Sequence, residues 1–341
     1  MIEATLEGIK RLLVGEVRAE PRDVARRVGE RLGLSRQAVN RHLRQLVASG
    51  LLIAEGETRN RTYRLAVVAQ AKAVLPIDPS LAEDQAWRAH ALPVLAVAPD
   101  DVRDVCEYGF TEIVNNAKDH SGSPTVGLSV ERDALSVTIT VTDEGVGVYR
   151  KIKEAYGLED ERYAVFELSK GRLTTDPEHH TGEGLFFACR MFDRFSLRSG
   201  GLDLVHGRDS GDVLLEVDER RPGTTVTMTI ALDSPHTLRE VFDRYAGEQD
   251  DYAFRRTQVV VALARLEGET LVSRSHAKRV LARLDRFREV TLDFRGVETI
   301  GPAFADEIFR VFARAHPGVR LDPIRASDDV QRMIRRARTA S

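Results

Sequence analysis

Three short motifs in the central third of the chain constrain its fold more than any other feature. The first is YGFTEIVNNAKDHS, in which Glu112 and Asn116 are four residues apart. The second is DEGVG, which begins at Asp143, and the third is HTGEGL, which ends at Leu185. A fold that uses all three motifs must bring one helix face and two glycine turns to the same place.

The first motif is predicted to lie on a long helix from about Asp100 to His120. The spacing of Glu112 and Asn116 is i and i+4, which places both side chains on one helix face, and Asp119 and His120 continue that face. The opposite side is apolar and is expected to pack on a sheet. Its residues are Val102, Val105, Phe110, Ile113, Val114 and Ala117.

The second motif ends a pair of predicted antiparallel strands, PTVGLSVE and ALSVTITVTD. Asp143 can accept a hydrogen bond from an exocyclic amine, and Gly145 and Gly147 let the backbone approach a base closely. The third motif precedes an apolar helix, and a glycine-rich turn at a helix N-terminus presents free N–H groups to phosphate. A closing strand, GTTVTMTIAL, begins at Gly223.

The order of these motifs resembles the N box, first glycine box, lid and second glycine box of the GHKL ATPase superfamily, over roughly residues 81–233. The resemblance implies a two-layer α/β-sandwich of the Bergerat type that binds ATP and Mg²⁺. It further implies that Asn116 coordinates the magnesium ion, Glu112 orients or deprotonates the attacking water or hydroxyl, and Asp143 contacts the adenine amine. The other implied nucleotide contacts are Asp119, His120, Gly145, Gly147, Gly182, Gly184, Leu185 and Thr225.

The polar stretch from Tyr149 to Thr181 corresponds to the lid of that superfamily and is expected to close over the triphosphate. Four side chains in it are candidates for phosphate contacts, and the alternative for each is a solvated loop position. They are Lys170, Arg172, His179 and His180.

The first 67 residues are predicted to form a winged helix-turn-helix that binds duplex DNA. Residues 1–66 contain thirteen Lys and Arg against eight Asp and Glu, although the whole chain has a net charge of -3. The third helix is expected from Arg36 to about Ala48, with Ser35 as its N-cap. Its polar face combines guanidinium groups with amides that can read base edges, and two more arginines lie on the predicted wing. These candidates are Arg36, Gln37, Asn40, Arg41, Arg44, Arg59 and Arg61. The alternative is a protein-docking module with a solvated charged face.

From Thr257 the chain alternates strands and helices as βαβαβα. The stretch EVTLDFRGVETIGPAFADEIF resembles the STAS fold of anti-anti-sigma factors, and more closely a STAS-like domain attached to GHKL ATPases. The resemblance implies a partner protein. The turn that carries the phosphorylated Ser or Thr in such factors is Gly301-Pro302-Ala303 here, so it has no hydroxyl, although Thr299 lies nearby.

We therefore predict a multidomain α+β chain with a winged helix-turn-helix, a Bergerat-type ATPase domain and a small βαβαβα STAS-like domain. The predicted boundaries are 1–67, a linker 68–80, 81–235, a linker helix 236–256, and 257–341. Such a chain would couple ATP and Mg²⁺ to the binding of DNA and of a partner protein. The alternatives are an anti-sigma-type serine/threonine protein kinase and a non-catalytic ATP-sensing scaffold, and Glu112 favours hydrolysis or phosphoryl transfer.

Composition narrows the setting in which this regulator is expected to work. The only two cysteines, Cys106 and Cys189, lack metal-ligand spacing, so we expect neither a disulfide nor a zinc site. No apolar run approaches the roughly 18 residues of a membrane span. These features predict a cytoplasmic protein without a membrane partner. A homodimer is one assembly that such a chain can form.

Overall fold

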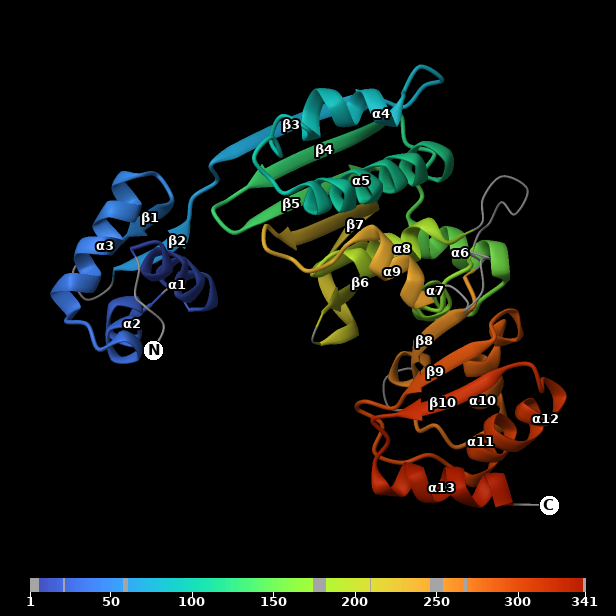
Figure 1. Cartoon of the computed structure of the whole chain (residues 1–341). Coiled ribbons are helices and arrows are strands. Elements are labelled where there is room, and N and C mark those ends of the chain that lie inside the picture. The colour runs from blue at the N-terminus through green and yellow to red at the C-terminus, as the bar shows by residue number, and fades with distance from the viewer. Residues whose placement is uncertain are drawn as a thin grey trace.

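Three folded units follow one another along the chain (Figure 1). The computed structural model describes residues 6–20, 22–57, 61–173, 182–208, 210–245, 254–265 and 269–339. Arg59, His179 and His180 lie outside these ranges, so the expectations for their side chains stay predictions. None of the helices in the described ranges combines the length and apolar composition that a membrane-spanning helix needs.

The N-terminal unit consists of three helices and a β-hairpin. Its helices are α1 (Leu6–Ala19), α2 (Val24–Leu32) and α3 (Arg36–Ala48), and its antiparallel strands are β1 (Leu52–Glu55) and β2 (Thr62–Leu65). The predicted third helix is confirmed together with its cap, because the Ser35 hydroxyl accepts a hydrogen bond from the Ala38 N–H at 3.2 Å. Leu13, Val28 and Leu43 are buried in a core that belongs to this unit alone.

The middle unit is built on a five-stranded sheet in the order β3-β4-β5-β7-β6, and every neighbouring pair is antiparallel. The strands are β3 (Ala69–Pro76), β4 (Thr125–Arg132), β5 (Ser136–Asp143), β6 (Arg194–Gly207) and β7 (Gly211–Ala231). Side chains on β5 alternate, so Val137, Ile139 and Val141 are buried while the intervening threonines are half-buried. The buried side of the sheet faces the helices (Figure 1).

The helical layer of the middle unit contains the predicted long helix with the predicted bounds, α5 (Asp100–His120). Beside it lie α8 (Gly184–Met191) and α9 (Leu238–Tyr245), and a short α4 (Glu83–Ala86) continues into a π-helical turn at Trp87–Ala91. The stretch expected to be a polar lid is partly helical, with α6 (Val148–Tyr156) and α7 (Glu161–Ser169).

Two predicted linkers are corrected by this arrangement. Residues 69–76 of the predicted linker 68–80 form the edge strand β3, which pairs with β4 along its whole length. Pro76 ends that strand, where the lack of an N–H costs little. The predicted linker helix 236–256 contributes α9 to the middle unit, because Phe242 contacts the rings of Tyr108 and Phe187 at centroid distances of 5.5 and 4.7 Å.

The C-terminal unit confirms the predicted alternation of strands and helices. Its parallel sheet has the order β10-β9-β8, formed by β8 (Arg256–Val260), β9 (Glu289–Asp293) and β10 (Arg320–Ile324). Its helices are α10 (Arg274–Leu281), α11 (Pro302–Asp306) with its extension through Glu307–Phe312 to α12 (Ala313–Ala315), and α13 (Asp328–Thr339). Short 3-10 turns lie at Val261–Ala264 and Leu284–Arg286.

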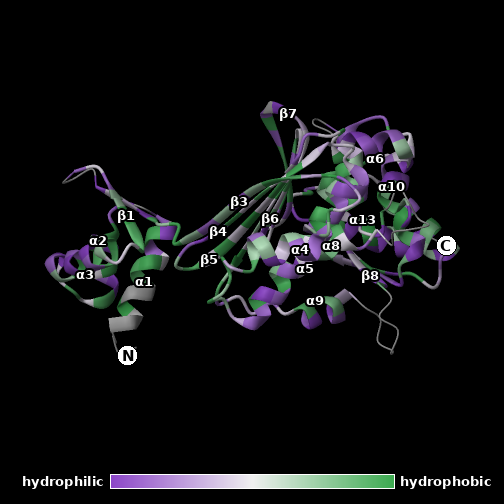
Figure 2. Cartoon of the chain, turned by 90° about the horizontal axis from the view of Figure 1, so that it is seen from above, coloured by the Kyte–Doolittle hydropathy of each residue, from purple (hydrophilic) through white to green (hydrophobic). Residues whose placement is uncertain are grey.

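The hydrophobic core is continuous between the middle and C-terminal units but separate in the N-terminal unit. Phe254, just before β8, contacts Phe186 and Phe187 of α8 with ring centroids 4.6 and 5.2 Å apart. By contrast, Ala134 and Leu135 are the only hydrophobic residues in the described part of the middle unit that pack on the N-terminal core. Figure 2 shows the N-terminal unit standing apart from the other two, beyond the ends of strands β3, β4 and β5.

Candidate functional site

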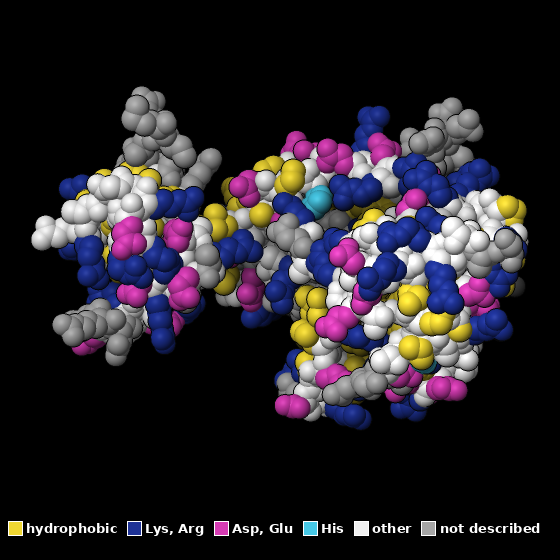
Figure 3. Space-filling view, turned by 90° about the horizontal axis from the view of Figure 1, so that it is seen from below, with side chains coloured by type: hydrophobic (Ala, Val, Ile, Leu, Met, Phe, Trp, Pro, Cys, Tyr) yellow, Lys and Arg dark blue, Asp and Glu magenta, His cyan; other side chains and the backbone are white. Residues whose placement is uncertain are grey.

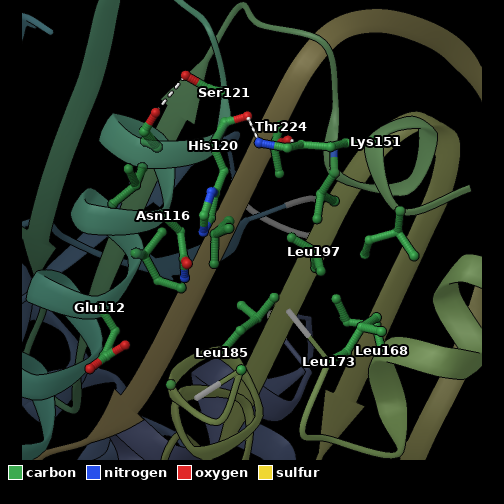
Figure 4. A pocket seen from close by; sticks show the side chains of 18 of the residues that line it. Glu112, Asn116, His120, Ser121, Lys151, Leu168, Leu173, Leu185, Leu197 and Thr224 are labelled. Carbon is green, nitrogen blue, oxygen red and sulfur yellow. Dashed lines mark hydrogen bonds between the residues drawn. The ribbon is translucent and has the colours of Figure 1, made fainter. Parts of the chain in front are cut away.

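A cavity of about 400 Å³ lies between α5, the sheet and helices α6 to α8. All three motifs predicted to act together reach this cavity. Eight of the candidate residues line it: Glu112, Asn116, His120, Asp143, Gly147, Gly182, Gly184 and Leu185. Figure 4 shows Glu112, Asn116 and His120 projecting from one face of α5 toward the opposite wall, where Leu168, Leu173 and Leu197 lie.

The two polar side chains of the first motif lie in unusual surroundings. The amide nitrogen of Asn116 is buried and has no hydrogen-bond partner among the described residues. An unsatisfied buried amide costs free energy, so a polar ligand in the cavity would relieve that cost. Glu112 lies against the N-terminal end of α8, where a Cβ added at Gly184 would be 1.7 Å from Glu112 Oε2. Any larger residue at position 184 would displace the Glu112 carboxylate from this place.

Asp143 lies at the far end of the cavity from Glu112, where β5 ends. Its side chain is buried, and the loss of solvation raises the carboxyl pKa, although hydrogen bonds from the N–H groups of Gly145 and Thr224 oppose this. Gly147 has φ 84°, and a Cβ there would lie 2.6 Å from Ser199 Oγ. This backbone is accessible only to glycine, which keeps the end of the cavity open beside Asp143.

Gly145 supports the site without lining it. A Cβ at this position would lie 2.0 Å from the carbonyl oxygen of Ser121, so the loop after β5 can close over the end of α5 only with glycine there. The Val146 N–H then donates to that Ser121 carbonyl at 2.9 Å. Asp119 is exposed and lies outside the cavity lining, although its spacing of seven residues from Glu112 places it on the same helix face.

The prediction of Thr225 is corrected, because its neighbour Thr224 lines the cavity instead. Thr224 is paired with Asp143 in the strand register, lines the cavity, and its hydroxyl accepts a hydrogen bond from the Val148 N–H at 3.1 Å. Thr225 points to the other face of the sheet, 3.4 Å from the hydroxyl of Thr142. Strand alternation explains the correction, since Val226 and Thr224 share the inward face.

The positive charge of the cavity comes from a residue that the sequence analysis did not select. Lys151 of α6 lines the cavity, and its ammonium group donates to the carbonyl oxygen of His120 at 2.9 Å (Figure 4). Lys170, which was expected to touch phosphate, is fully buried and points toward the C-terminal unit instead. Arg172 donates to the Arg286 carbonyl oxygen at 3.0 Å and lies 3.5 Å from Glu183.

Glu183 is a third carboxylate on the cavity wall, after Glu112 and Asp143. Burial raises its carboxyl pKa, and Arg172 partly offsets that effect. Tyr108 borders the same region, where burial and the carboxylates of Glu112 and Glu183 raise the phenol pKa. Glu183 could have been predicted from its position in the third motif. A loop that presents Gly182 and Gly184 to the cavity also presents the residue between them.

A cluster of Cys189, His206 and Asp212 is the one group of described residues whose ligand atoms lie within 4.8 Å of one another, as a metal site would need. Arg190 donates to Asp212 Oδ2 at 2.7 Å, and His206 Nδ1 lies 2.7 Å from Asp212 Oδ1. Burial opposes ionisation of Asp212, but Arg190 and His206 outweigh it and hold the carboxyl pKa well below its usual range. The guanidinium group thus takes the place that a cation would need.

The candidate DNA-contacting residues lie on the outer side of the N-terminal unit. Arg36, Gln37, Arg41 and Arg44 are exposed along α3, Asn40 is half-buried between them, and Arg61 is exposed at the start of the second wing strand. Figure 3 shows several Lys and Arg side chains on this unit, with some Asp and Glu side chains between them. The inward face of α3 packs through Val39, Leu43 and Leu46, so its polar face is presented to the outside.

Comparisons with known proteins identify both terminal units. Residues 6–53 match a family described as winged helix-turn-helix DNA-binding, and residues 276–331 match a STAS-like domain of unknown function. The chain therefore carries a winged helix-turn-helix of the DNA-binding kind and a STAS-like domain. No curated protein matches the chain.

Two solved structures of regulators show a weak likeness. One is the crystal structure of an IcIR transcriptional regulator from Alicyclobacillus acidocaldarius, with 15% identity over 66% of this chain and 87% of that chain, and a TM-score of 0.21. The other is Pseudomonas aeruginosa HmgR, with 14% identity over 66% of this chain and 85% of that chain, and a TM-score of 0.18. Scores this low do not define a shared overall fold.

Proposed function

We propose that this chain is a nucleotide-controlled regulator whose middle unit binds ATP with Mg²⁺ and thereby alters how the winged helix binds DNA. The observation that carries the proposal is the convergence of Glu112, Asn116, Asp143 and the glycine turn at 182–184 on one cavity. The unpartnered buried amide of Asn116 supports a polar ligand in that cavity. The DNA-binding family match of residues 6–53 supports the regulatory output.

The donor set of the cavity fits a nucleotide triphosphate. Asp143 would accept a hydrogen bond from the adenine amine, and Gly147 and Thr224 border that end. At the other end, the backbone N–H groups at the start of α8 would face the phosphates. Lys151 lies at the Asp143 end, where its ammonium group donates to the His120 carbonyl oxygen. The Asn116 amide oxygen is a suitable ligand for Mg²⁺, which prefers oxygen donors and keeps several waters.

Magnesium, when bound, would neutralise phosphate charge and orient the terminal phosphoryl group. Glu112 would then hold the attacking water or hydroxyl and accept its proton, since its carboxylate lies beside Gly184 at the phosphate end. The leucines at positions 168, 173 and 185 exclude water from the rest of the cavity wall. This arrangement favours hydrolysis or phosphoryl transfer over sensing alone.

The proposal is tested first by nucleotide binding to the full chain. We expect a non-hydrolysable ATP analogue with Mg²⁺ to bind in calorimetry, and Asn116→Ala to weaken binding more than about tenfold, because a metal ligand is lost. Asn115→Ala is the matched control, since Asn115 is also half-buried on α5 but lies outside the cavity lining. Absence of binding to the unmodified chain, or equal loss in both variants, would contradict the proposal.

The second test separates catalysis from sensing. Glu112→Gln should leave analogue binding in place and reduce phosphate release, or transfer of the labelled γ-phosphoryl group to a co-purified protein, by about 10²- to 10⁴-fold. Transfer to a protein without release would identify a protein kinase. If duplex DNA affinity is the same with and without the analogue, the coupling to DNA is wrong even when ATP is bound.

A further inference from the structure

The segment from Glu167 to Leu173 belongs to two surfaces at once. Leu168 and Leu173 line the cavity, as Figure 4 shows. Glu167, just before Leu168, and Lys170, between the two leucines, contact the C-terminal unit. Any displacement of this segment therefore changes the cavity wall and the contact between units together. Ligand pockets often lie at domain interfaces, and here one segment belongs to both the pocket and the interface.

Lys170 is fully buried and fixes the segment on the end of α10. Its ammonium group donates to Glu167 Oε1 at 2.7 Å and to the carbonyl oxygens of Arg279 and Ala282, both at 3.0 Å. The last carbonyls of a helix lack intrahelical partners and carry partial negative charge, so a cation there is well placed. These three acceptors match the three N–H donors of the ammonium group.

Glu167 completes the anchor through its contacts with Arg283. Arg283 of the C-terminal unit donates to Glu167 Oε2 at 2.8 Å and to the Glu167 carbonyl oxygen at 2.9 Å. Thr257, on β8, donates its hydroxyl to the carbonyl oxygen of Lys170 at 2.7 Å. One short segment of the middle unit is thus bonded to both the first strand and the first helix of the C-terminal unit.

The next residue, Gly171, brings the aromatic core against the same segment. It has φ 80°, and a Cβ there would lie 2.6 Å from the ring of Phe254 and 2.9 Å from that of Phe186. Phe186 directly follows Leu185, which lines the cavity from α8. The cavity wall at Leu168 and Leu173 and the wall at Leu185 are therefore both adjacent to residues that pack between the units.

We propose that Glu167 and Lys170 are positioning residues of the nucleotide cavity, which hold its leucine wall in place by anchoring it to α10 of the STAS-like unit. The inference rests on the proposed nucleotide function and adds its regulation. Because coupling between two equilibria is reciprocal, bound nucleotide strengthens the docking of the C-terminal unit by the same factor by which docking strengthens nucleotide binding. A partner protein that binds the C-terminal unit better when it is undocked would therefore weaken nucleotide binding.

The charges of the anchor support a positioning role. Burial lowers the pKa of Lys170 to about 8, and the Glu167 carboxylate opposes that shift while Arg283 adds to it. A buried ion pair of this kind contributes little net stability compared with apolar side chains of the same size. It does restrict the segment to one register, because any other position would leave a buried charge without its partner.

The test compares the ATP-analogue affinities of two full-length variants, Lys170→Met and Arg325→Met. Lys170→Met keeps the apolar stem and removes the ammonium group, and we expect it to weaken binding of a Mg²⁺-bound non-hydrolysable ATP analogue by about tenfold. Arg325→Met is the control, because it removes the cation from buried Asp293 inside the C-terminal unit, far along the chain from the cavity segment. Both variants lose thermal stability, but the control keeps its analogue affinity within about twofold.

A milder variant and a second readout guard against misfolding of Lys170→Met. Thr257→Val removes one hydrogen bond at nearly constant volume and should weaken analogue binding by about two- to fivefold. In hydrogen exchange, the analogue should slow the amides of residues 278–286 in the unmodified chain and much less in Lys170→Met. The amides of α13 serve as the internal reference, since that helix lies outside the anchor.

The outcomes separate the two proposals. If the unmodified chain binds no ATP analogue, the proposed function is wrong, and the anchor loses its nucleotide role with it. If the unmodified chain binds but Lys170→Met and Thr257→Val bind equally well, the anchor alone is wrong. Equal loss of affinity in Arg325→Met and Lys170→Met also overturns the anchor, because general destabilisation would then explain both.

Discussion

The two junctions between the three units are built in different ways. The middle and C-terminal units share one core, and buried groups such as Lys170 and Glu167 bond across their boundary. The N-terminal unit has its own core, and the chain leaves it through Val67 and Val68, which are 46% and 39% exposed. Apart from this connection, Ala134 and Leu135 at the β4–β5 turn supply its packing contact with the sheet.

The difference indicates two ways in which one cavity can influence its neighbours. The C-terminal unit rests directly on the cavity wall, so a change at that wall reaches it through hydrogen bonds. The N-terminal unit contacts the tip of the β4–β5 hairpin. Strand β5 runs from that tip to Asp143 and so connects the contact to the cavity. We therefore expect strong, local coupling at one junction and weak coupling, carried along β5, at the other.

Truncation should expose the contrast most clearly. Removing residues 1–66 should leave a chain that unfolds cooperatively at nearly the original temperature, because the larger core is kept intact. Removing residues 254–341 should abolish cooperative unfolding, since Phe186 and Phe187 become exposed and Lys170 keeps only Glu167 as a partner. Calorimetry of both truncated chains makes the comparison, and a stable, cooperative 1–253 fragment would show that the two cores are independent.

Breaking the buried Arg190–Asp212 pair should have the next largest effect. The side chains of Arg190 and Asp212 are 8% and 2% exposed, and Asp212 also borders a cavity of about 660 Å³ shared with the C-terminal unit. Asp212→Asn should lower the free energy of unfolding by about 3–5 kcal/mol, because a buried guanidinium loses its counter-charge. Arg208→Ala breaks a more exposed pair with Asp193 and should cost less than about 1 kcal/mol.

Acidity gives an independent check of the same pair. The Asp212 carboxyl pKa lies below its unfolded value, so the pair stabilises the fold at neutral pH, and this contribution is lost as pH falls through the acidic range. Urea unfolding at several pH values should show that part of the acid sensitivity disappears in Asp212→Asn. An unchanged pH profile would mean that the pair is not ionised in the folded chain.

The local sequence pattern predicted those features that depend on a single helix or strand. The bounds of α5 and the common face of Glu112, Asn116 and His120 follow from helical spacing, and the cap at Ser35 follows from its side chain. The strand β3 was missed because its inward residues are mainly alanines and a proline ends it. Strand parity, applied from Val226, would have selected Thr224 in place of Thr225.

The role of Lys170 could not be predicted from neighbouring residues. Its partners, the carbonyls of Arg279 and Ala282, are 109 and 112 positions away along the chain, and backbone carbonyls leave no signature in a sequence. A lysine in a polar stretch beside a glycine motif was therefore assigned to phosphate. Only the packing of two units on each other distinguishes a phosphate ligand from an interdomain anchor.

Replacing one arginine of α3 should weaken DNA binding without touching either junction. Arg44→Ala should reduce affinity for duplex DNA about three- to tenfold and lower the slope of log affinity against log salt by about one, because one phosphate contact is lost. Arg88→Ala removes the same charge from an exposed pair in the middle unit and serves as the control. Fluorescence anisotropy at several salt concentrations measures both. Equal slopes in the two variants would assign α3 to a protein partner.

The smallest effect is expected at the hairpin tip. Leu135 is half-buried and packs on the N-terminal core, while its carbonyl accepts a hydrogen bond from the Leu232 N–H at 2.7 Å on the middle unit. Leu135→Ser removes the apolar contact and keeps that backbone bond, so stability should fall by no more than about 1–2 kcal/mol. The control Val319→Ser alters a half-buried residue of the C-terminal unit.

The informative measurement on Leu135→Ser is the difference in DNA affinity with and without the ATP analogue. If the β4–β5 turn carries the signal, this difference should shrink while affinity in the absence of nucleotide is unchanged, because the winged helix itself is intact. Val319→Ser should keep the full difference. If both variants keep it, the signal passes through β3 and the connection at Ala66 to Val68, whose backbone bonds to Leu51 and Arg132 survive the substitution.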